Sequence, residues 1–134
     1  MNVSKKRLKI LYDEKHYYFT AMTTKETWIL NETLGFSPLE NLVVSIGSCC
    51  AYVYDTVLTN SAVLHKFEKV EMDYGQLGRK KTDPLQWVEI HFYLQMEEKF
   101  QDKALRCLTL VQPNCPVVQS LKADISIKEH VHFI

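Results

Sequence analysis

The chain has 134 residues, of which 46% are hydrophobic and 24% charged, as is ordinary for a soluble globular protein of one domain over residues 1–134. Sixteen Lys and Arg residues balance sixteen Asp and Glu residues, so the formal net charge is zero. Nucleic acids and anionic membranes attract basic surfaces, and we therefore expect neither as a partner.

The N-terminal residues and the longest apolar stretch bear on localisation. The first 16 residues have no apolar core of signal-peptide length. The apolar stretch 42–58 contains Ser45, Ser48 and Asp55, so a buried helix of a soluble protein fits it better than a membrane span. We expect a cytoplasmic protein whose four cysteines are core residues, metal ligands or redox-active thiols rather than structural disulfides.

The N-terminal third reads as short strands. Loose alternation over residues 3–12 predicts a first strand, and residues 17–23 predict a second. The apolar patch at residues 28–30 is a candidate third strand, and Gly35 ends this meander.

A long helix is expected after the meander. Ser37 is a favourable N-cap, Pro38 suits the first helical position, and Glu40 lies in the first turn. Apolar residues then recur at alternating spacings of four and three, which only a helix aligns on one face. Neighbouring positions are apolar too, so the helix is expected to be enclosed on most sides and to end near residues 59–61. The aligned positions are Leu39, Val43, Ile46, Cys50, Val53 and Val57.

The second half predicts a hairpin, two helices and a final strand. The two hairpin strands alternate apolar and polar residues, and Gly78 and Asp83-Pro84 mark the loop between them. The element order predicts an α+β fold with an antiparallel β-sheet and a long buried central helix. The expected elements are strands over 69–74 and 88–96, a helix over about 101–111, a short helix from Pro116 and a strand over 123–128.

The cysteines are the main candidates for chemistry. Free cysteine is among the most buried residue types, and Cys50 and Cys107 fit the apolar faces of their helices. Cys49 instead shares a helix face with hydroxyl-bearing side chains, which are either satisfied within the core or line a small polar pocket around a reactive sulfur. These side chains belong to Ser45, Tyr52 and Thr56.

Cys115 precedes Pro116, which places it at or next to the N-cap of a short helix. Unpaired backbone amides and the helix dipole at that position stabilise a thiolate and lower its pKa. A tight turn with the sulfur packed away is the equally weighted alternative.

Metal and cofactor sites receive less support. His130 and His132 share a strand face, but without a third ligand at a telling spacing a solvated strand edge is favoured. With four glycines the chain has no glycine-rich phosphate loop, and no serine has a nucleophile-elbow context. We therefore expect no metal and no cofactor.

Two segments together resemble the OsmC/Ohr family of osmotically inducible and organic-hydroperoxide-resistance proteins. The first runs from Ser37-Pro38 to Cys49 and is similar to the family helix, in which a proline-led start is followed by a cysteine at this distance. The second, Asn114-Cys115-Pro116-Val117, is similar to the family's Cys-Pro-Val motif and leads into residues 119–125.

The resemblance implies an intertwined homodimer with the central helices side by side and active sites at the subunit interface. It implies a peroxidatic Cys49 and a resolving Cys115, with an organic hydroperoxide as substrate, a dithiol as reductant and no metal, flavin or haem. Family peroxidases carry a glutamate directly after the helix proline and an arginine from the N-terminal region. This chain has Leu39 at the first position, Glu40 one residue later, and no arginine in the loop before Ser37.

Two other functions stay open on the sequence. One is a non-catalytic dimer of the same fold that binds a small apolar or thiol-bearing ligand at the subunit interface. Leu39 and the seven Tyr and six Phe residues motivate this alternative. The other is a structural or interaction dimer whose cysteines are core residues.

Overall fold

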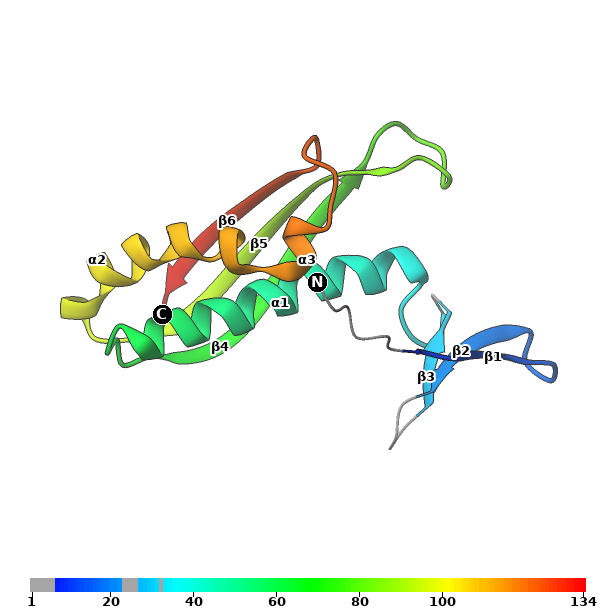
Figure 1. Cartoon of the computed structure of the whole chain (residues 1–134), viewed down its shortest axis with the longest axis horizontal. Helices are drawn as coiled ribbons and strands as arrows, with labels where there is room; N and C mark the ends of the chain where they lie inside the picture. The colour runs from blue at the N-terminus through cyan, green and yellow to red at the C-terminus, as the bar shows by residue number, and fades with distance from the viewer. Residues whose placement is uncertain (1–6, 23–26, 32) are drawn as a thin grey trace, which may run out of the picture. The chain divides into compact units, whose positions relative to one another are not determined.

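The computed structural model describes residues 7–22, 27–31 and 33–134, and its contacts divide the chain into two compact units, Met1–Leu42 and Val43–Ile134 (Figure 1). The prediction of one domain therefore stays a prediction. In chain order the elements are β1 Ile10–Asp13, β2 Tyr18–Met22, β3 Thr27–Leu30, α1 Pro38–Asn60, β4 Lys66–Gln76, β5 Leu85–Gln95, α2 Glu98–Cys107, the 3-10 turns η1 Leu108–Leu110 and η2 Gln112–Asn114, α3 Pro116–Gln119 and β6 Ser126–Phe133.

The N-terminal unit contains an antiparallel sheet in the order β1-β2-β3, as the expected meander requires. Residues 3–6 and Thr23, which the sequence placed in the first two strands, lie outside the described residues. Thr20 is buried, whereas Phe19 and Trp28 are about half exposed, so this sheet has little core of its own.

The start of α1 is a reciprocal cap. The backbone amide of Glu40 donates to Ser37 Oγ at 3.1 Å, and the amide of Ser37 donates to Glu40 Oε1 at 3.0 Å. This capping box satisfies two amides that a helix start leaves unpaired, and it confirms the predicted helix start. It also commits the Glu40 carboxylate to the backbone.

Only one face of α1 is buried within the chain, so the expected enclosure on most sides is wrong for a single copy. On the opposite side Tyr52 is 77% exposed. The helix is long and apolar enough to cross a membrane by length and composition, a test that core helices of soluble proteins also pass. Its buried residues are Val43, Ile46, Gly47, Cys50, Tyr54 and Leu58.

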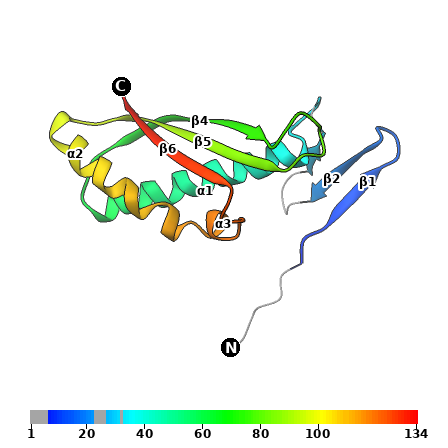
Figure 2. The same ribbon diagram turned by 90° about the horizontal axis from the view of Figure 1, so that it is seen from above.

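The C-terminal unit has a three-stranded sheet in the order β4-β5-β6, with α1, α2 and α3 on one face (Figure 2). The hairpin of β4 and β5 is antiparallel as predicted, but β5 and β6 pair in parallel. The segment from α2 to α3 returns the chain to the end of the sheet where β5 begins, and such a crossover produces a parallel pair. The fold is α+β, as the element order predicts.

The two faces of this sheet differ in burial. Alternate β5 residues, Val88, Ile90, Phe92 and Leu94, are fully buried. The residues between them are half-buried or exposed and include Glu89, His91 and Tyr93.

Buried contacts join α1 to its neighbours in the C-terminal unit. The Tyr54 hydroxyl donates to the carbonyl oxygen of Ala104 in α2 at 2.7 Å, and its ring lies 5.1 Å from that of Phe92. A side chain at Gly47 would collide with Met72 of β4, so glycine permits the close approach of α1 to the sheet.

Two predicted boundaries differ from the structure. The helix expected over about 101–111 begins earlier and gives way to 3-10 turns, the second of which contains Pro113. Proline has no amide hydrogen to continue an α-helix, which explains the change. The last strand begins at Ser126 rather than at residue 123, and it extends through His132.

Candidate functional site: a cluster of three thiols

The sulfur atoms of Cys50 and Cys115 lie 3.8 Å apart, and both side chains are fully buried. Cys50 comes from the middle of α1 and Cys115 from the residue before α3, 65 positions later. The predicted burial of Cys50 is confirmed, but its proximity to Cys115 was not anticipated. Both cysteines are free thiols.

Cys49 contributes a third thiol and is only half-buried. Burial raises the pKa of Cys49, and a side-chain hydrogen bond with Cys115 raises it further. A hydrogen bond with the backbone amide of Val117 acts in the opposite direction. Cys115 therefore interacts with both cysteines of α1.

Cys115 is the N-cap residue of α3, as predicted, but its side chain makes no capping hydrogen bond. The helix has only four residues, so it adds little to the local dipole. Its second residue, Val117, directs its amide to Cys49. The helix start thus favours the thiolate form of Cys49.

The electrostatic surroundings of Cys50 favour the neutral thiol. Burial raises the pKa of Cys50 most, and nearby Cys115 and Glu129 raise it further because each adds negative charge when ionised. Burial also raises the pKa of Glu129, while a hydrogen bond from Gln112 partly offsets this. Glu129 Oε2 is buried without a hydrogen-bond partner among the described residues.

Sequence reasoning missed Cys50 and Glu129 as members of this site. Glu129 lies on the same side of β6 as the apolar residues Ile127 and Val131. An acid among apolar residues of one strand face could have indicated that it belongs to a site. Cys50 lies on the apolar stripe of α1. A buried Cys115 has to pack against that face of the helix, so this position could have indicated the contact between the two cysteines.

The remaining predictions for cysteines and hydroxyls have mixed outcomes. Cys107 is buried, as predicted, with its sulfur 3.6 Å from Ser61 Oγ. Tyr52 and Thr56 line a hollow of about 440 Å³ next to Asn114, but the residues lining it do not include Cys49. This hollow is therefore not a pocket around the Cys49 sulfur.

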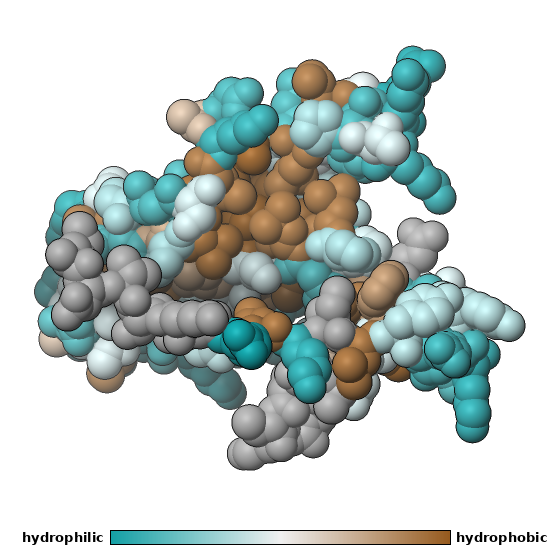
Figure 3. Space-filling model, turned by 45° about the vertical axis from the view of Figure 1, so that its right-hand side comes forward, coloured by the Kyte–Doolittle hydropathy of each residue, from teal (hydrophilic) through white to brown (hydrophobic). Residues whose placement is uncertain are grey.

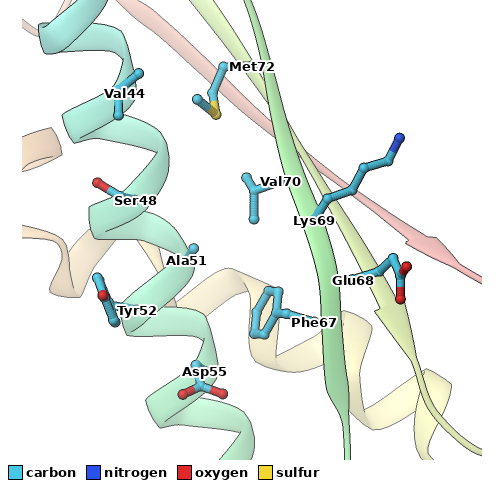
Figure 4. A pocket seen from close by; sticks show the side chains of 10 residues that line it. All are labelled: Val44, Ser48, Ala51, Tyr52, Asp55, Phe67, Glu68, Lys69, Val70 and Met72. Atoms are coloured by element: carbon cyan, nitrogen blue, oxygen red, sulfur yellow. The ribbon is translucent and has the colours of Figure 1, made fainter.

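A larger groove lies between α1 and β4, with a volume of about 570 Å³. Hydrophobic side chains also gather in a hollow on the face of the molecule in Figure 3. Figure 4 shows Phe67, Val70 and Met72 of β4 on one side of the groove and Val44 and Ala51 of α1 on the other. Polar side chains at the groove include Ser48, Tyr52, Asp55, Glu68 and Lys69.

A sequence model of the family described as OsmC-like protein matches residues 31–130. The match spans α1, the thiol cluster and most of β6, so the chain belongs to the OsmC-like family. No curated protein matches the chain.

Solved structures with the same fold cover nearly the whole chain. A hypothetical protein from Aquifex aeolicus VF5 has a TM-score of 0.74 at 20% identity, with 98% of each chain covered. An OsmC-like protein from Mycoplasma pneumoniae has a TM-score of 0.73 at 16% identity, again with 98% of each chain covered. The organic hydroperoxide resistance protein OhrB of Bacillus subtilis has a TM-score of 0.66 at 9% identity, covering 95% of this chain and 98% of its own.

Proposed function

We propose that the protein is a thiol-dependent reductase of organic hydroperoxides that uses Cys49 and Cys115. The observation that carries the proposal is the convergence of α1 and the start of α3 on a cluster of free thiols, in which Cys115 lies 3.8 Å from Cys50 and raises the pKa of Cys49. Membership of the OsmC-like family and the structural similarity to the organic hydroperoxide resistance protein OhrB of Bacillus subtilis support hydroperoxides as the substrate class.

Cys49 is the thiol that a peroxide reaches. It is half-buried, whereas Cys50 and Cys115 have no exposed surface. The Cys49 thiolate attacks one peroxide oxygen, the O–O bond breaks, and the leaving alkoxide takes a proton to become an alcohol. Cys49 is thereby oxidised to a sulfenic acid.

Cys115 completes the oxidative half of the cycle. Its sulfur attacks the sulfenic sulfur of Cys49, which forms a disulfide and releases water. A dithiol of the cytoplasm then reduces the disulfide by thiol exchange and is itself oxidised to a disulfide. This sequence uses no metal, flavin or haem.

The structure favours a slow peroxidase over a fast one. The pKa of Cys49 is raised, so little thiolate is present at neutral pH. Glu40, the acid near the helix start, has its carboxylate in the capping box. A group that activates the Cys49 thiol further has to come from a partner subunit.

We propose that the partner is a second copy of this chain, seated on the uncovered side of α1. Three strands without a core of their own are not independently stable, and large side chains of β1–β3 are exposed. The groove beside α1 is apolar and open as well. A homodimer buries both surfaces without another protein.

Peroxide consumption with a dithiol reductant tests the proposal. Wild type is expected to turn over an organic hydroperoxide, Cys49→Ser to lose turnover, and Cys115→Ser to be oxidised without forming the Cys49 disulfide. Cys107→Ser is the matched control because Cys107 is buried away from the cluster against Ser61. Unchanged consumption in both Cys49→Ser and Cys115→Ser would overturn the proposal.

A second function has its own supporting observation. The groove between α1 and β4 is apolar, and the raised pKa of Cys49 disfavours its reactive form. A non-catalytic dimer that binds a small apolar or thiol-bearing ligand predicts no peroxide turnover by wild type. Rapid, Cys49-dependent turnover excludes it.

A further inference from the structure

Three histidines and two carboxylates gather on the face of the β4-β5-β6 sheet that the helices leave uncovered (Figure 2). One ligand atom from each of Glu89, His91 and His130 lies within 4.8 Å of the others. We propose that this cluster binds one divalent transition-metal ion of the zinc type, held by two imidazoles and one or two carboxylates.

The pairing of the strands fixes the cluster. The parallel register places His91 opposite His130 and Tyr93 opposite His132. The antiparallel register places Asp73 opposite Glu89. Since paired residues point to the same side of a sheet, all of these side chains share the outer face. Sequence spacing identified only His130 and His132, because the third histidine comes from a different strand.

The distances between ligand atoms are near those of a four-coordinate site. Zinc ligands bond at 2.0–2.2 Å in a tetrahedron, which separates neighbouring ligand atoms by about 3.4 Å. His91 Nε2 lies 3.4 Å from Asp73 Oδ2 and 4.0 Å from Glu89 Oε2. His130 Nε2 lies 3.7 Å from Glu89 Oε2. The ligand atoms of Glu89, His91 and His130 are separated by up to 4.8 Å, so metal binding requires these side chains to close in by up to about 1.4 Å.

His132 is placed to orient His91 rather than to bind the ion. His91 Nδ1 and His132 Nε2 lie 2.9 Å apart. A metal bound at His91 Nε2 requires the proton on Nδ1, which then donates to His132 Nε2. Metal-bound histidines regularly donate their second N–H in this way, which fixes the ring orientation and the tautomer.

His130 gives a second, separate observation. Its Nε2 atom is inaccessible to solvent and has no hydrogen-bond partner among the described residues. The ring stacks on His91, with centroids 4.8 Å apart. A bound ion would give this nitrogen a direct ligand bond, which its 3.7 Å contact with Glu89 Oε2 is too long to supply as a hydrogen bond.

Titration of the metal-free full chain with Co²⁺ and Zn²⁺ tests the proposal. We expect one ion per chain and weak cobalt d–d absorption without the intense thiolate charge-transfer band that the cysteines would give. His91→Gln and His130→Gln are expected to weaken binding more than about 100-fold, beyond the loss typical of outer-shell changes. His132→Ala removes the orienting acceptor and is expected to cost about 10-fold.

His16→Gln is the matched control, because His16 lies in the N-terminal unit beside Asp13. Its affinity should equal that of wild type. Glu89→Gln removes the carboxylate but keeps the shape of the side chain, so it tests the ligand without a change in packing. Thermal unfolding without metal verifies that each variant is folded. Absent binding, binding unchanged in His91→Gln, or a thiolate charge-transfer band lost in Cys49→Ser would each overturn the proposal.

Discussion

The Cys50 sulfur lies 3.8 Å from the Cys115 sulfur, and Cys115 also raises the pKa of Cys49, the preceding residue of α1. One buried thiol thus faces two candidate partners from a single helix turn. Cys49 is the one that solvent reaches. Disulfide formation and peroxide reduction can therefore be separated by substitution.

In Cys49→Ser, a thiol oxidant that forms disulfides directly is expected to join Cys50 to Cys115. The two sulfurs lie 3.8 Å apart, so an approach of about 1.8 Å brings them to disulfide bonding distance. Peroxide turnover should nevertheless be lost, because the exposed thiol is absent. Peptide mapping by mass spectrometry identifies the linked cysteines. A free Cys115 in the oxidised variant contradicts this prediction.

The rate of peroxide reduction should still rise with pH beyond the ordinary thiol pKa of about 8.5. Burial and the hydrogen bond with Cys115 raise the pKa of Cys49, so the thiolate fraction grows about tenfold for each pH unit below that value. Single-turnover kinetics of the reduced protein with excess organic hydroperoxide measure this profile.

A plateau near neutral pH contradicts the pH prediction, since it requires a group that lowers the pKa of Cys49. A small free thiol measured in the same buffers provides the reference. Its rate should level off near its ordinary pKa of about 8.5.

Tyr54→Phe is expected to destabilise the fold by about 1–3 kcal/mol. The change removes the hydroxyl that donates to Ala104 O at 2.7 Å and leaves a buried carbonyl without that donor. Urea unfolding of the reduced protein measures the effect. Tyr52→Phe is the matched control on the same helix, because Tyr52 is 77% exposed. Equal effects of the two substitutions contradict the assigned role of the Tyr54 bond.

The free energy of unfolding is expected to fall above about pH 8.5. Burial raises the pKa of Cys50, so the native chain keeps a proton that the unfolded chain loses at about 8.5. The native state then binds more protons, and stability falls by about 1.4 kcal/mol per pH unit for such a group. Above about pH 10 Tyr54 adds to the fall, because burial raises the pKa of Tyr54 as well.

Urea unfolding in reducing buffers between pH 8 and 10 measures this slope. Cys50→Ala lowers stability near pH 8 because it leaves a cavity, but it should flatten the slope at higher pH. If the free energy of unfolding of Cys50→Ala falls with pH as steeply as that of wild type, groups other than Cys50 cause the fall, and the prediction is contradicted.

The helix start at Ser37-Pro38 and the hairpin were predictable because they depend on local signals. Capping, proline geometry and period-two alternation act within a few residues. The parallel pairing of β6 was not predictable, because the path of the segment after β5 sets its direction. The histidine cluster depends on that pairing, so spacing within the sequence did not reveal its third member.

The thiol cluster was predictable in part. Motif resemblance selected Cys49 and Cys115, and periodicity placed Cys50 on the buried face of α1. Adjacent helix residues differ by about 100° in direction, yet both α1 thiols interact with Cys115. Packing between α1 and α3 decides such contacts, and no local signal encodes them.

The proposed homodimer can be disrupted at the groove beside α1. Ala51→Asp places a charge in the apolar groove between α1 and β4, on the side of α1 that a second copy is proposed to cover. An unpaired charge buried in an interface costs about 3 kcal/mol or more, which corresponds to at least about 100-fold weaker association. Sedimentation equilibrium should show a dimer for wild type and monomers for the variant.

Leu105→Asp provides the control for the dimer experiment. It introduces the same acid in place of an exposed apolar residue of α2, outside the groove. This variant should stay dimeric, and circular dichroism verifies that both variants are folded. A monomeric wild type contradicts the proposed dimer, and a dimeric Ala51→Asp contradicts the placement of its interface. Loss of peroxide turnover together with dimer dissociation would indicate that the partner subunit activates Cys49.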